Sequence, residues 1–302
     1  MTENERVGRS TGGTVNSTVR AINEETAPAR SRTRESAGTL SASVTLMARA
    51  FTSAATAMWL AVVLSFVCSS ATRASDLDGV RQLVVATAPS WDAFEGTAQR
   101  FERVGAGWKP YGKPWAVLYG KRGLAWGTGV HGQEEKGLHK VENDGRSPAG
   151  VFRIGTVYTY DSALPPGSEY PFHTVTAADA WIDDVNHPKY NQHVIVDPKN
   201  PPPWYAKQRM RLGDFAYRWL VEIRHNSDPA TPGLGSAIFF HLRRGTHKPS
   251  VGCTVMAEPD LVSLIRWLRA DAKPHFALLP RDEYAAKWKA WNLPPPDADG
   301  KK

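Results

Sequence analysis

Ser250-Val251-Gly252-Cys253-Thr254-Val255-Met256 is the stretch from which the organisation of this chain is best read. Before it, the apolar run Ala237-Ile238-Phe239-Phe240 predicts a strand that delivers His241 at its end. After it, Glu258-Pro259-Asp260 predicts the start of a helix through about residue 270, because proline and acidic residues are favoured in a first helical turn. The segment therefore predicts a turn that places one thiol between two buried elements.

The chain carries the features of an export signal. Residues 54–67 form a short run of apolar and small residues behind Arg49, which fits a signal-peptide core better than a membrane span. Ser69-Ser70-Ala71 supplies small residues for cleavage, and cleavage after Ala71 removes the only other cysteine, Cys68. Two alternatives stay open, a retained N-terminal anchor and lipid attachment at Cys68. A lone thiol in an exported protein has no disulfide partner, which favours a chemical role.

The chain divides into four predicted segments. Residues 1–46 are polar and poor in apolar residues, which predicts disorder or an extension ahead of a true start near Met47. Residues 47–75 are the predicted signal peptide or anchor. Residues 76–292 are long enough for one domain with a sizeable core, and residues 293–302 are a predicted disordered tail.

The net charge of +7 gives no strong indication of an anionic partner. Eight of the 37 Lys and Arg residues and five of the 30 Asp and Glu residues lie in residues 1–75, so the remainder carries only +4. These charges are spread along the chain. A nucleic-acid-binding protein usually concentrates them in a basic stripe with aromatic residues, so we expect no nucleic-acid partner.

Residues 76–292 read mainly as strands and turns, followed by helices. No strand–helix–strand alternation is present, so a doubly wound parallel sheet is not expected. A hairpin is predicted over 115–128 with its turn at 121–123, and a short buried strand at 194–196. Further strands are predicted at 82–87, 150–154, 236–240 and 275–279, and helices at 91–103, 258–270 and 282–291.

Three long connections, at 129–149, 158–192 and 197–210, hold many aromatic residues. Loops of this length in a compact domain are usually functional or flexible. Each aromatic side chain is most simply part of a small core, but as a set they would wall a groove for an extended ligand. Trp181 is our candidate from this set.

The thiol of Cys253 needs a neighbour that accepts its proton before it becomes a good nucleophile. His241 lies 12 residues upstream, and His247 is the competing candidate six residues upstream. Gly252 leaves room for a ligand near the backbone, so the amides of Gly252 and Cys253 are candidates for an oxyanion site. Ser250 is placed to orient the imidazole or to bond within the turn. A small core residue is the competing interpretation of Cys253.

These residues resemble the L,D-transpeptidase catalytic domain, or YkuD-like, family of cell-wall enzymes. The family has an upstream histidine followed by Ser/Thr-x-Gly-Cys, which His241 and Ser250-Val251-Gly252-Cys253 match. A second element, Ser/Thr-Pro-x-Gly-x-Phe, is matched by Ser147-Pro148-Ala149-Gly150-Val151-Phe152. The resemblance covers roughly residues 80–280.

The resemblance implies a mainly β (α+β) domain of two packed mixed sheets with short helices. It implies that Cys253 attacks a peptidoglycan tetrapeptide stem at the carbonyl of meso-diaminopimelate and expels D-Ala. The thioester then passes to an amine of another stem, or to water. His241 is the implied base, and no metal or organic cofactor is required. Arg243 and Arg244 are candidates for holding substrate carboxylates, because guanidinium pairs with them bidentately.

Two departures from the family pattern keep alternatives open. Many members have His directly before the Gly-Cys pair and Arg or Asn two residues after the cysteine, where this chain has Val251 and Val255. A hydrolytic member and a non-catalytic wall-binding module are therefore the competing functions. A zinc peptidase would need a ligand set, but His-Glu-x-x-His is absent. The nearest cluster (His131, Glu134, Glu135, His139) is more simply a solvated loop.

Overall fold

The main sheet closes on itself through its last strand, β12 (His275–Pro280). The structure is a computed structural model that describes residues 77–296. Within these residues, β12 pairs in parallel with β1 (Gln82–Ala88) and antiparallel with β5 (Ser147–Thr159). The path between them runs β1-β2-β3-β11-β10-β9-β5. The other strands of this path are β2 (Glu95–Val104), β3 (Gly107–Leu118), β9 (Trp219–Ile223), β10 (Phe239–Leu242) and β11 (Thr254–Met256).

Closure encloses the largest group of buried apolar side chains in the described chain. Phe152, Phe240 and Phe276 are among the largest fully buried residues, and they come from three different strands of the ring. Two short strands extend it from β5, namely β4 (Leu124–Trp126) and β6 (Phe172–Thr174), both parallel to it. The prediction of a mainly β domain with mixed sheets and few short helices is confirmed.

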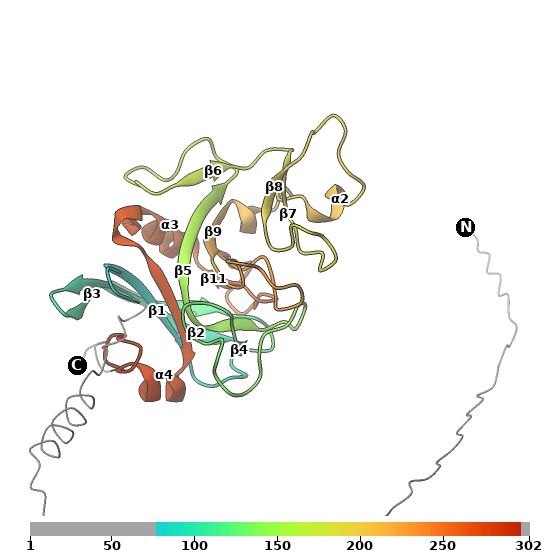
Figure 1. The fold of residues 1–302 in the computed structure, drawn as a ribbon. Helices are drawn as coiled ribbons and strands as arrows, with labels where there is room; N and C mark the ends of the chain where they lie inside the picture. The colour runs from blue at the N-terminus through green and yellow to red at the C-terminus, as the bar shows by residue number, and fades with distance from the viewer. Residues whose placement is uncertain (1–76, 297–302) are drawn as a thin grey trace, which may run out of the picture. The chain divides into compact units, whose positions relative to one another are not determined.

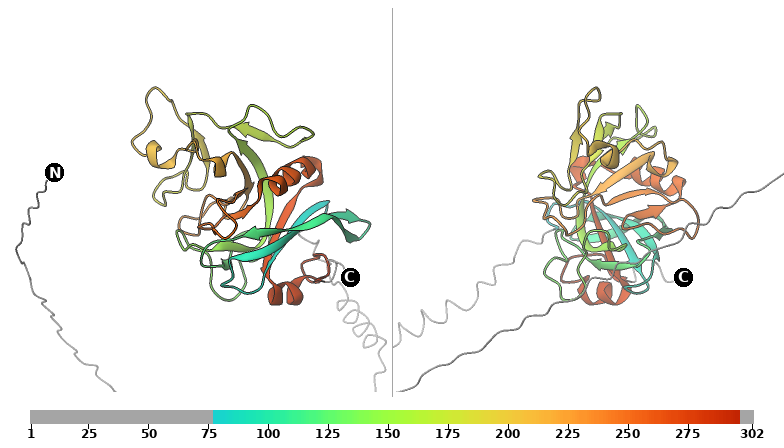
Figure 2. Two further views of the ribbon diagram at one scale, coloured as in Figure 1. Left: turned by 180° about the vertical axis from the view of Figure 1, so that it is seen from behind. Right: turned by 90° about the vertical axis from the view of Figure 1, so that its right-hand side faces the viewer.

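Two of the helices lie near opposite ends of the sheet (Figures 1 and 2). α3 (Glu258–Trp267) begins with the predicted proline in its first turn and buries Leu261, Leu264 and Ile265 against the core. α4 (Arg281–Lys287) follows β12 directly and buries Tyr284. The remaining helical segments are single turns, α2 (Tyr205–Gln208), η1 (Phe215–Tyr217) and η2 (Ala270–Ala272).

A separate two-stranded ribbon stands at the end of the domain away from α4 (Figure 1). It pairs β7 (Asp179–Trp181) antiparallel with β8 (His193–Ile195), with Trp181 opposite His193. A strand near 194–196 was predicted, but its burial was wrong, because Ile195 is 66% exposed. β8 has only one partner strand and does not enter the main sheet, so its β-branched residues are not covered on both faces.

The predicted helix over 91–103 is wrong, and β2 occupies most of that range. Its helical spacing came from Phe94, Ala98 and Phe101. Ala98 and Phe101 are indeed buried, at 1% and 2% exposure. They belong to a strand bonded to β1 on one side and β3 on the other. Four consecutive residues from Ala98 are buried, so both faces of β2 are covered at this point. In a strand buried on both faces, apolar residues three positions apart do not indicate a helix.

The predicted hairpin over 115–128 is correct only at its turn. The amide of Gly123 donates to the carbonyl of Gly120 at 2.8 Å, which closes the turn. The chain after it, β4, pairs with β5 and not with β3. The two sides of β3 are already taken by β2 and β11, so no position beside it is left for a returning strand.

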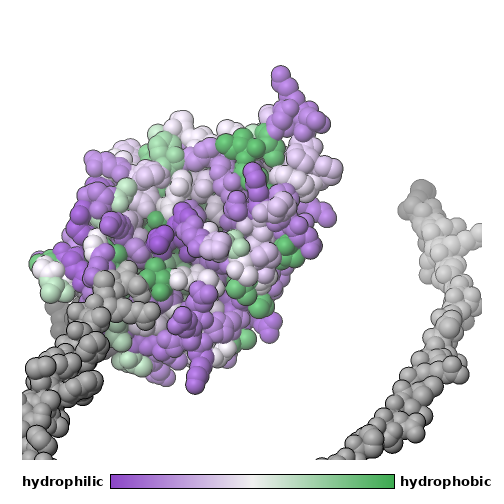
Figure 3. Space-filling view, in the orientation of Figure 1, coloured by the Kyte–Doolittle hydropathy of each residue, from purple (hydrophilic) through white to green (hydrophobic). Residues whose placement is uncertain are grey.

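The described part of the tail packs on the domain. Leu293 is 3% exposed within the core, and the hydroxyl of Tyr284 donates to the carbonyl of Pro294 at 2.7 Å. The predictions for residues 1–46 and 47–75 concern residues outside the described range. No helix within residues 77–296 is both long and apolar enough to cross a bilayer. On the face shown in Figure 3, hydrophobic residues form small separate patches among hydrophilic ones.

Candidate active site

Cys253 lies in the wall of a pocket of about 450 Å³. β10 and the loop before β11 form one side of this pocket, and the β7–β8 ribbon contributes Trp181 to another. The thiol is half-buried and packs in a small apolar cluster with Phe239, Trp181 and Tyr217. The lining includes Cys253, Gly252, Ala237, Phe239, Trp181 and Lys140.

The two motifs quoted from the sequence meet at the carbonyl group of Cys253. The hydroxyl of Ser250 donates to this oxygen at 2.5 Å, and the hydroxyl of Ser147 donates to it at 3.2 Å. The backbone of Ser250 is itself fixed, because its amide donates to Tyr119 at 2.8 Å and its carbonyl accepts from Lys121 at 2.9 Å. Residues far apart in sequence therefore hold the loop Ser250–Cys253, called the nucleophile loop below for the predicted role of its thiol, from both sides.

Gly252 fits a narrow space behind the thiol. A Cβ atom at this position would lie 3.2 Å from the carbonyl oxygen of Arg146 and 3.7 Å from Nζ of Lys140. Its amide donates to Oγ of Ser250 at 3.0 Å. The predicted oxyanion donor at Gly252 is thus engaged within the loop in this state, and it becomes available to a ligand only when the Ser250 hydroxyl turns away.

The thiol of Cys253 is protonated at neutral pH. Its Sγ donates to the carbonyl oxygen of Ala237 at 3.5 Å. Burial raises the pKa of Cys253 to about 11, and the Phe239 amide, Lys140 and Arg244 offset only part of that rise. A thiol in this state is a poor nucleophile until a base removes its proton.

His241 lies on the same side of the sheet as Cys253. In the parallel pair β10–β11, Phe240 lies opposite Thr254 and His241 opposite Val255. Strand alternation puts His241 on the side of Phe239, whose cluster includes Cys253, while Phe240 faces the main core. Cys253 directly precedes β11, so it lies diagonal to His241, which pairs with Val255 two residues further along.

The imidazole of His241 is a neutral base held away from the thiol. It is 4% exposed, and its Nδ1 lies 2.9 Å from the carbonyl oxygen of Leu242. Burial lowers the pKa of His241 to about 4, and hydrogen bonding to the backbone offsets part of that effect. Within residues 77–296, no hydrogen bond joins this ring to the Cys253 thiol, so the two groups must approach before a proton passes between them.

Tyr217 and the ion pair of Arg244 with Asp214 lie beside His241. The ring of Tyr217 contacts the imidazole edge-on, with centroids 5.1 Å apart, and the Arg244 guanidinium lies 4.9 Å from the centre of the Tyr217 ring. Arg244 pairs with Asp214, whose carboxylate also accepts from the amide of Ala216. Burial alone would raise the pKa of Asp214, but bonds from Arg244 and Ala216 lower it overall.

The predicted substrate-binding residues separate into two groups. Trp181 lines the pocket. Arg243, Arg244 and His247 do not line it. Arg244 is committed to Asp214, and the His247 ring is 79% exposed and bonds Glu95 at 3.1 Å. The buried position of His241 beside the cluster of Cys253 favours it over His247 as the base.

Lys140 is a pocket residue that the sequence did not reveal. Its side chain is 4% exposed, its Nζ bonds the Asp144 carboxylate at 2.7 Å, and it lies next to Gly252. Asp144 also accepts from the amides of Val141 and Arg146, so the pair is well anchored. A buried cation beside the nucleophile loop favours negative charge there. Only its place in the long 129–149 connection hinted at this role.

A comparison with protein-family models matches residues 97–275 to the L,D-transpeptidase catalytic domain. The chain belongs to this family. The matched range includes both motifs, His241 and Lys140, and agrees with the resemblance drawn from the sequence. Comparison with curated proteins and with solved structures gave no match.

The two departures from the family pattern have different structural settings. Val251 is 71% exposed at the pocket rim. A valine side chain therefore stands there in place of the imidazole that many members carry. Val255 is 2% exposed and pairs with Leu118 of β3, so it is a core strand position. The polar groups that many L,D-transpeptidase domains carry at these two positions are replaced here by one exposed and one packed valine.

Proposed function

We propose that this protein is a cysteine acyltransferase that acts on peptidoglycan stem peptides. Family membership supports the substrate class, and the position of Cys253 supports the chemistry. The observation that carries the proposal is a single described thiol in the wall of a pocket, diagonal to a neutral, buried imidazole. A core cysteine would have neither a pocket nor a base on its own side of the sheet.

The proposed reaction has two steps. Sγ of Cys253 bonds to the meso-diaminopimelate carbonyl carbon of a tetrapeptide stem while His241 takes the thiol proton. The tetrahedral intermediate collapses, the bond to D-Ala breaks, and the leaving amine receives the proton from His241. An amine of a second stem or a water molecule then attacks the thioester and releases the thiol. No metal or organic cofactor takes part.

The site without substrate supports a mechanism in which substrate binding activates the thiol. It does not support a thiolate–imidazolium pair that exists before substrate binds. Both the thiol and the imidazole are neutral near pH 7, as the pKa values of about 11 and about 4 require. Binding of the stem peptide would displace the thiol from Ala237 and release the Gly252 amide from Ser250. The amide would then bond the oxyanion, and Lys140 would stabilise the same negative charge.

We further propose that the protein works outside the cytoplasm, after export directed by residues 47–71. A wall-facing location would bring the pocket to its polymer substrate. The test is to follow a fusion of the full chain to a reporter that is active only after export. A variant with charged residues in place of Leu60 and Val63 should then lose the signal. Equal signal from both forms would contradict export through this segment.

The direct test of the chemistry is mass spectrometry of the intact protein after incubation with a disaccharide tetrapeptide. We expect an adduct on Cys253 that is lost in Cys253→Ala. We also expect its formation to slow by about 100-fold or more in His241→Gln, since general-base catalysis commonly contributes that much. His247→Gln is the matched control and should form the adduct at the wild-type rate.

Product analysis in the same reaction separates the competing functions. Cross-linked dimers with released D-Ala indicate transpeptidation, and free tripeptide with D-Ala indicates hydrolysis. Binding of the stem with no adduct and no D-Ala would identify a non-catalytic wall-binding module and would contradict the proposal.

A further inference from the structure

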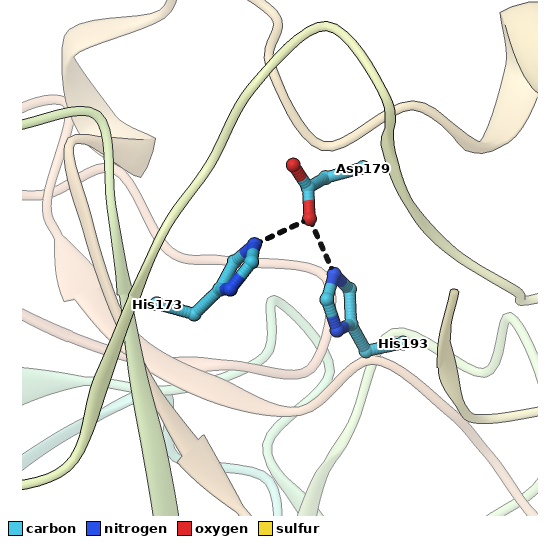
Figure 4. A group of neighbouring side chains, drawn as sticks. All are labelled: His173, Asp179 and His193. Atoms are coloured by element: carbon cyan, nitrogen blue, oxygen red, sulfur yellow. Dashed lines mark hydrogen bonds and ion pairs between the residues drawn. The ribbon is translucent and has the colours of Figure 1, made fainter. Parts of the chain in front are cut away.

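Two imidazole rings from different strands converge on one buried carboxylate outside the proposed catalytic residues (Figure 4). His173 is on β6, Asp179 on β7 and His193 on β8. Nε2 of each histidine lies 2.6 Å from Oδ1 of Asp179, and the three candidate ligand atoms all lie within 4.8 Å of one another. The cluster thus joins the ribbon to the strand bonded to β5.

The carboxylate of Asp179 is held in one orientation. It is 1% exposed, and its second oxygen, Oδ2, accepts from the amide and hydroxyl of Thr176 at 2.7 and 2.6 Å. These bonds fix Oδ2 and leave Oδ1 facing the two histidines. Within the described residues, no Lys or Arg forms an ion pair with it.

A buried carboxylate needs a compensating positive charge or a dense set of donors. Nε2 of both histidines faces the same oxygen, Oδ1, so two nitrogen atoms and one oxygen atom lie together at this carboxylate. Neutral imidazole nitrogen and carboxylate oxygen are together the donor set that zinc-class ions take.

We propose that His173, Asp179 and His193 form a binding site for a divalent first-row transition ion such as Zn²⁺. Nε2 of each histidine and Oδ1 of Asp179 would be its ligands. The two histidines are 33% and 18% exposed on their side chains, which leaves a solvent side for a fourth ligand. Each Nε2 gives up its proton on binding, and each neutral ring carries its proton on Nδ1 instead.

The required adjustment is small. Ligand atoms about 2.1 Å from a tetrahedral ion lie about 3.4 Å apart, so the two nitrogen–oxygen separations must widen by about 0.8 Å. Asp179 is fixed by Thr176, so the adjustment would come from the histidine rings, whose side chains are 33% and 18% exposed. Their ring centroids are 4.9 Å apart and the rings are tilted by 58°, so neither ring stacks flat on the other.

The ion would stabilise one wall of the active-site pocket. Trp181 follows Asp179 by two residues on β7, pairs with His193 in register, and lines the pocket. The ring of Tyr158 on β5 contacts His173, His193 and Trp181, with centroids 5.0–5.9 Å apart. Tying β6, β7 and β8 to one ion therefore fixes the orientation of the Trp181 side chain relative to the main sheet.

The test uses the full chain without a polyhistidine tag, first stripped of metal with chelator. Titration with Co²⁺ should produce the visible absorption bands of a four-coordinate site, and Zn²⁺ should abolish them. At Zn²⁺ about 100-fold above its dissociation constant, the melting temperature should rise by about 5 °C. The double variant His173→Gln/His193→Gln should show neither response, because glutamine amides can still donate to Asp179 but bind these ions poorly.

His187→Gln is the matched control on the neighbouring connection and should respond like wild type. The single variants, each with one imidazole left, should bind Zn²⁺ at least tenfold more weakly, and they decide the question if the double variant does not fold. The proposal is overturned if the wild type shows neither the bands nor the thermal shift. It is equally overturned if the histidine variants respond as the wild type does.

Discussion

The pH dependence of Cys253 alkylation is the sharpest consequence of this site. The thiol is half-buried, it donates to Ala237, and burial raises its pKa from the ordinary value of 9.0 to about 11. Only the thiolate reacts with iodoacetamide at a useful rate. A rise of two units leaves about 100-fold less thiolate at any pH below about 9. We therefore expect native Cys253 to react about 100-fold more slowly than the same residue in unfolded protein.

The assay measures incorporation at the Cys253 peptide by mass spectrometry between pH 6 and pH 11. The same protein in concentrated urea is the reference at each pH. Limited access of the reagent to the thiol also lowers the alkylation rate. The test therefore depends on how the rate changes with pH and not on its absolute value. The native rate should still rise tenfold per pH unit at pH 10, whereas the unfolded reference should level off near pH 9.

A native profile that is flat above pH 7, with rates exceeding those of unfolded protein, would refute the reasoning. Such a profile would mean that a thiolate–imidazolium pair exists before substrate binds. His241→Gln separates the two states further. Because no hydrogen bond joins this ring to the thiol in the described structure, the variant should keep the wild-type alkylation profile and yet lose acyl-enzyme formation.

Three more predictions concern stability and the nucleophile loop. Burial lowers the pKa of His225 to about 3 and of His241 to about 4, so the unfolded chain takes up these protons first below about pH 6.5. Lowering the pH from 7 to 5 should therefore cost about 2 kcal/mol of folding stability for each of these two histidines, seen by urea unfolding, and His225→Gln should remove the part that is due to His225. Lys140→Met should destabilise by about 3–5 kcal/mol because it leaves the Asp144 carboxylate without its cation, and adding Asp144→Asn, which keeps an acceptor for the amides of Val141 and Arg146, should recover most of it; a neutral single variant would contradict a buried pair. Ser250→Ala frees the Gly252 amide from its resting acceptor, so kcat/KM should rise about fivefold with little change in melting temperature. A loss of about tenfold would mean instead that the Ser250 hydroxyl positions the Cys253 carbonyl and does not act as a gate.

Local patterns predicted those elements whose burial follows a simple period. α3 was found from its first-turn proline and its apolar face, and β1 and β12 from short β-branched or apolar runs. β2 was mistaken for a helix because part of its covering comes from α3, which is remote in sequence and contacts the buried Arg100 through Ser263 and Trp267. The partner of β4 was wrong for the same reason, since β11 had already occupied the position beside β3.

Contacts within the site could be predicted from the sequence where the residues of a motif lie close together along the chain. Ser250 and Cys253 are three residues apart, so their contact is local. The bond from Ser147 to the same carbonyl joins residues separated by 106 positions and depends on how β5 meets the nucleophile loop. The positions of Lys140 and of the His173–Asp179–His193 cluster were likewise not predicted from the sequence. Each lies in a long connection whose sequence has no period, and only the tertiary fold brings its members together.

The proton energetics of the pair indicate where catalysis must come from. Burial raises the pKa of the Cys253 thiol and lowers that of the His241 imidazole, so both shifts oppose proton transfer between them in the resting geometry. Substrate binding must therefore lower the cost of separating charge, and the groups positioned to do so are the Gly252 amide, once Ser250 releases it, and the Lys140 ammonium. The hydrogen bond between Ser250 and Gly252 is then a gate, because the oxyanion donor forms only when substrate displaces it.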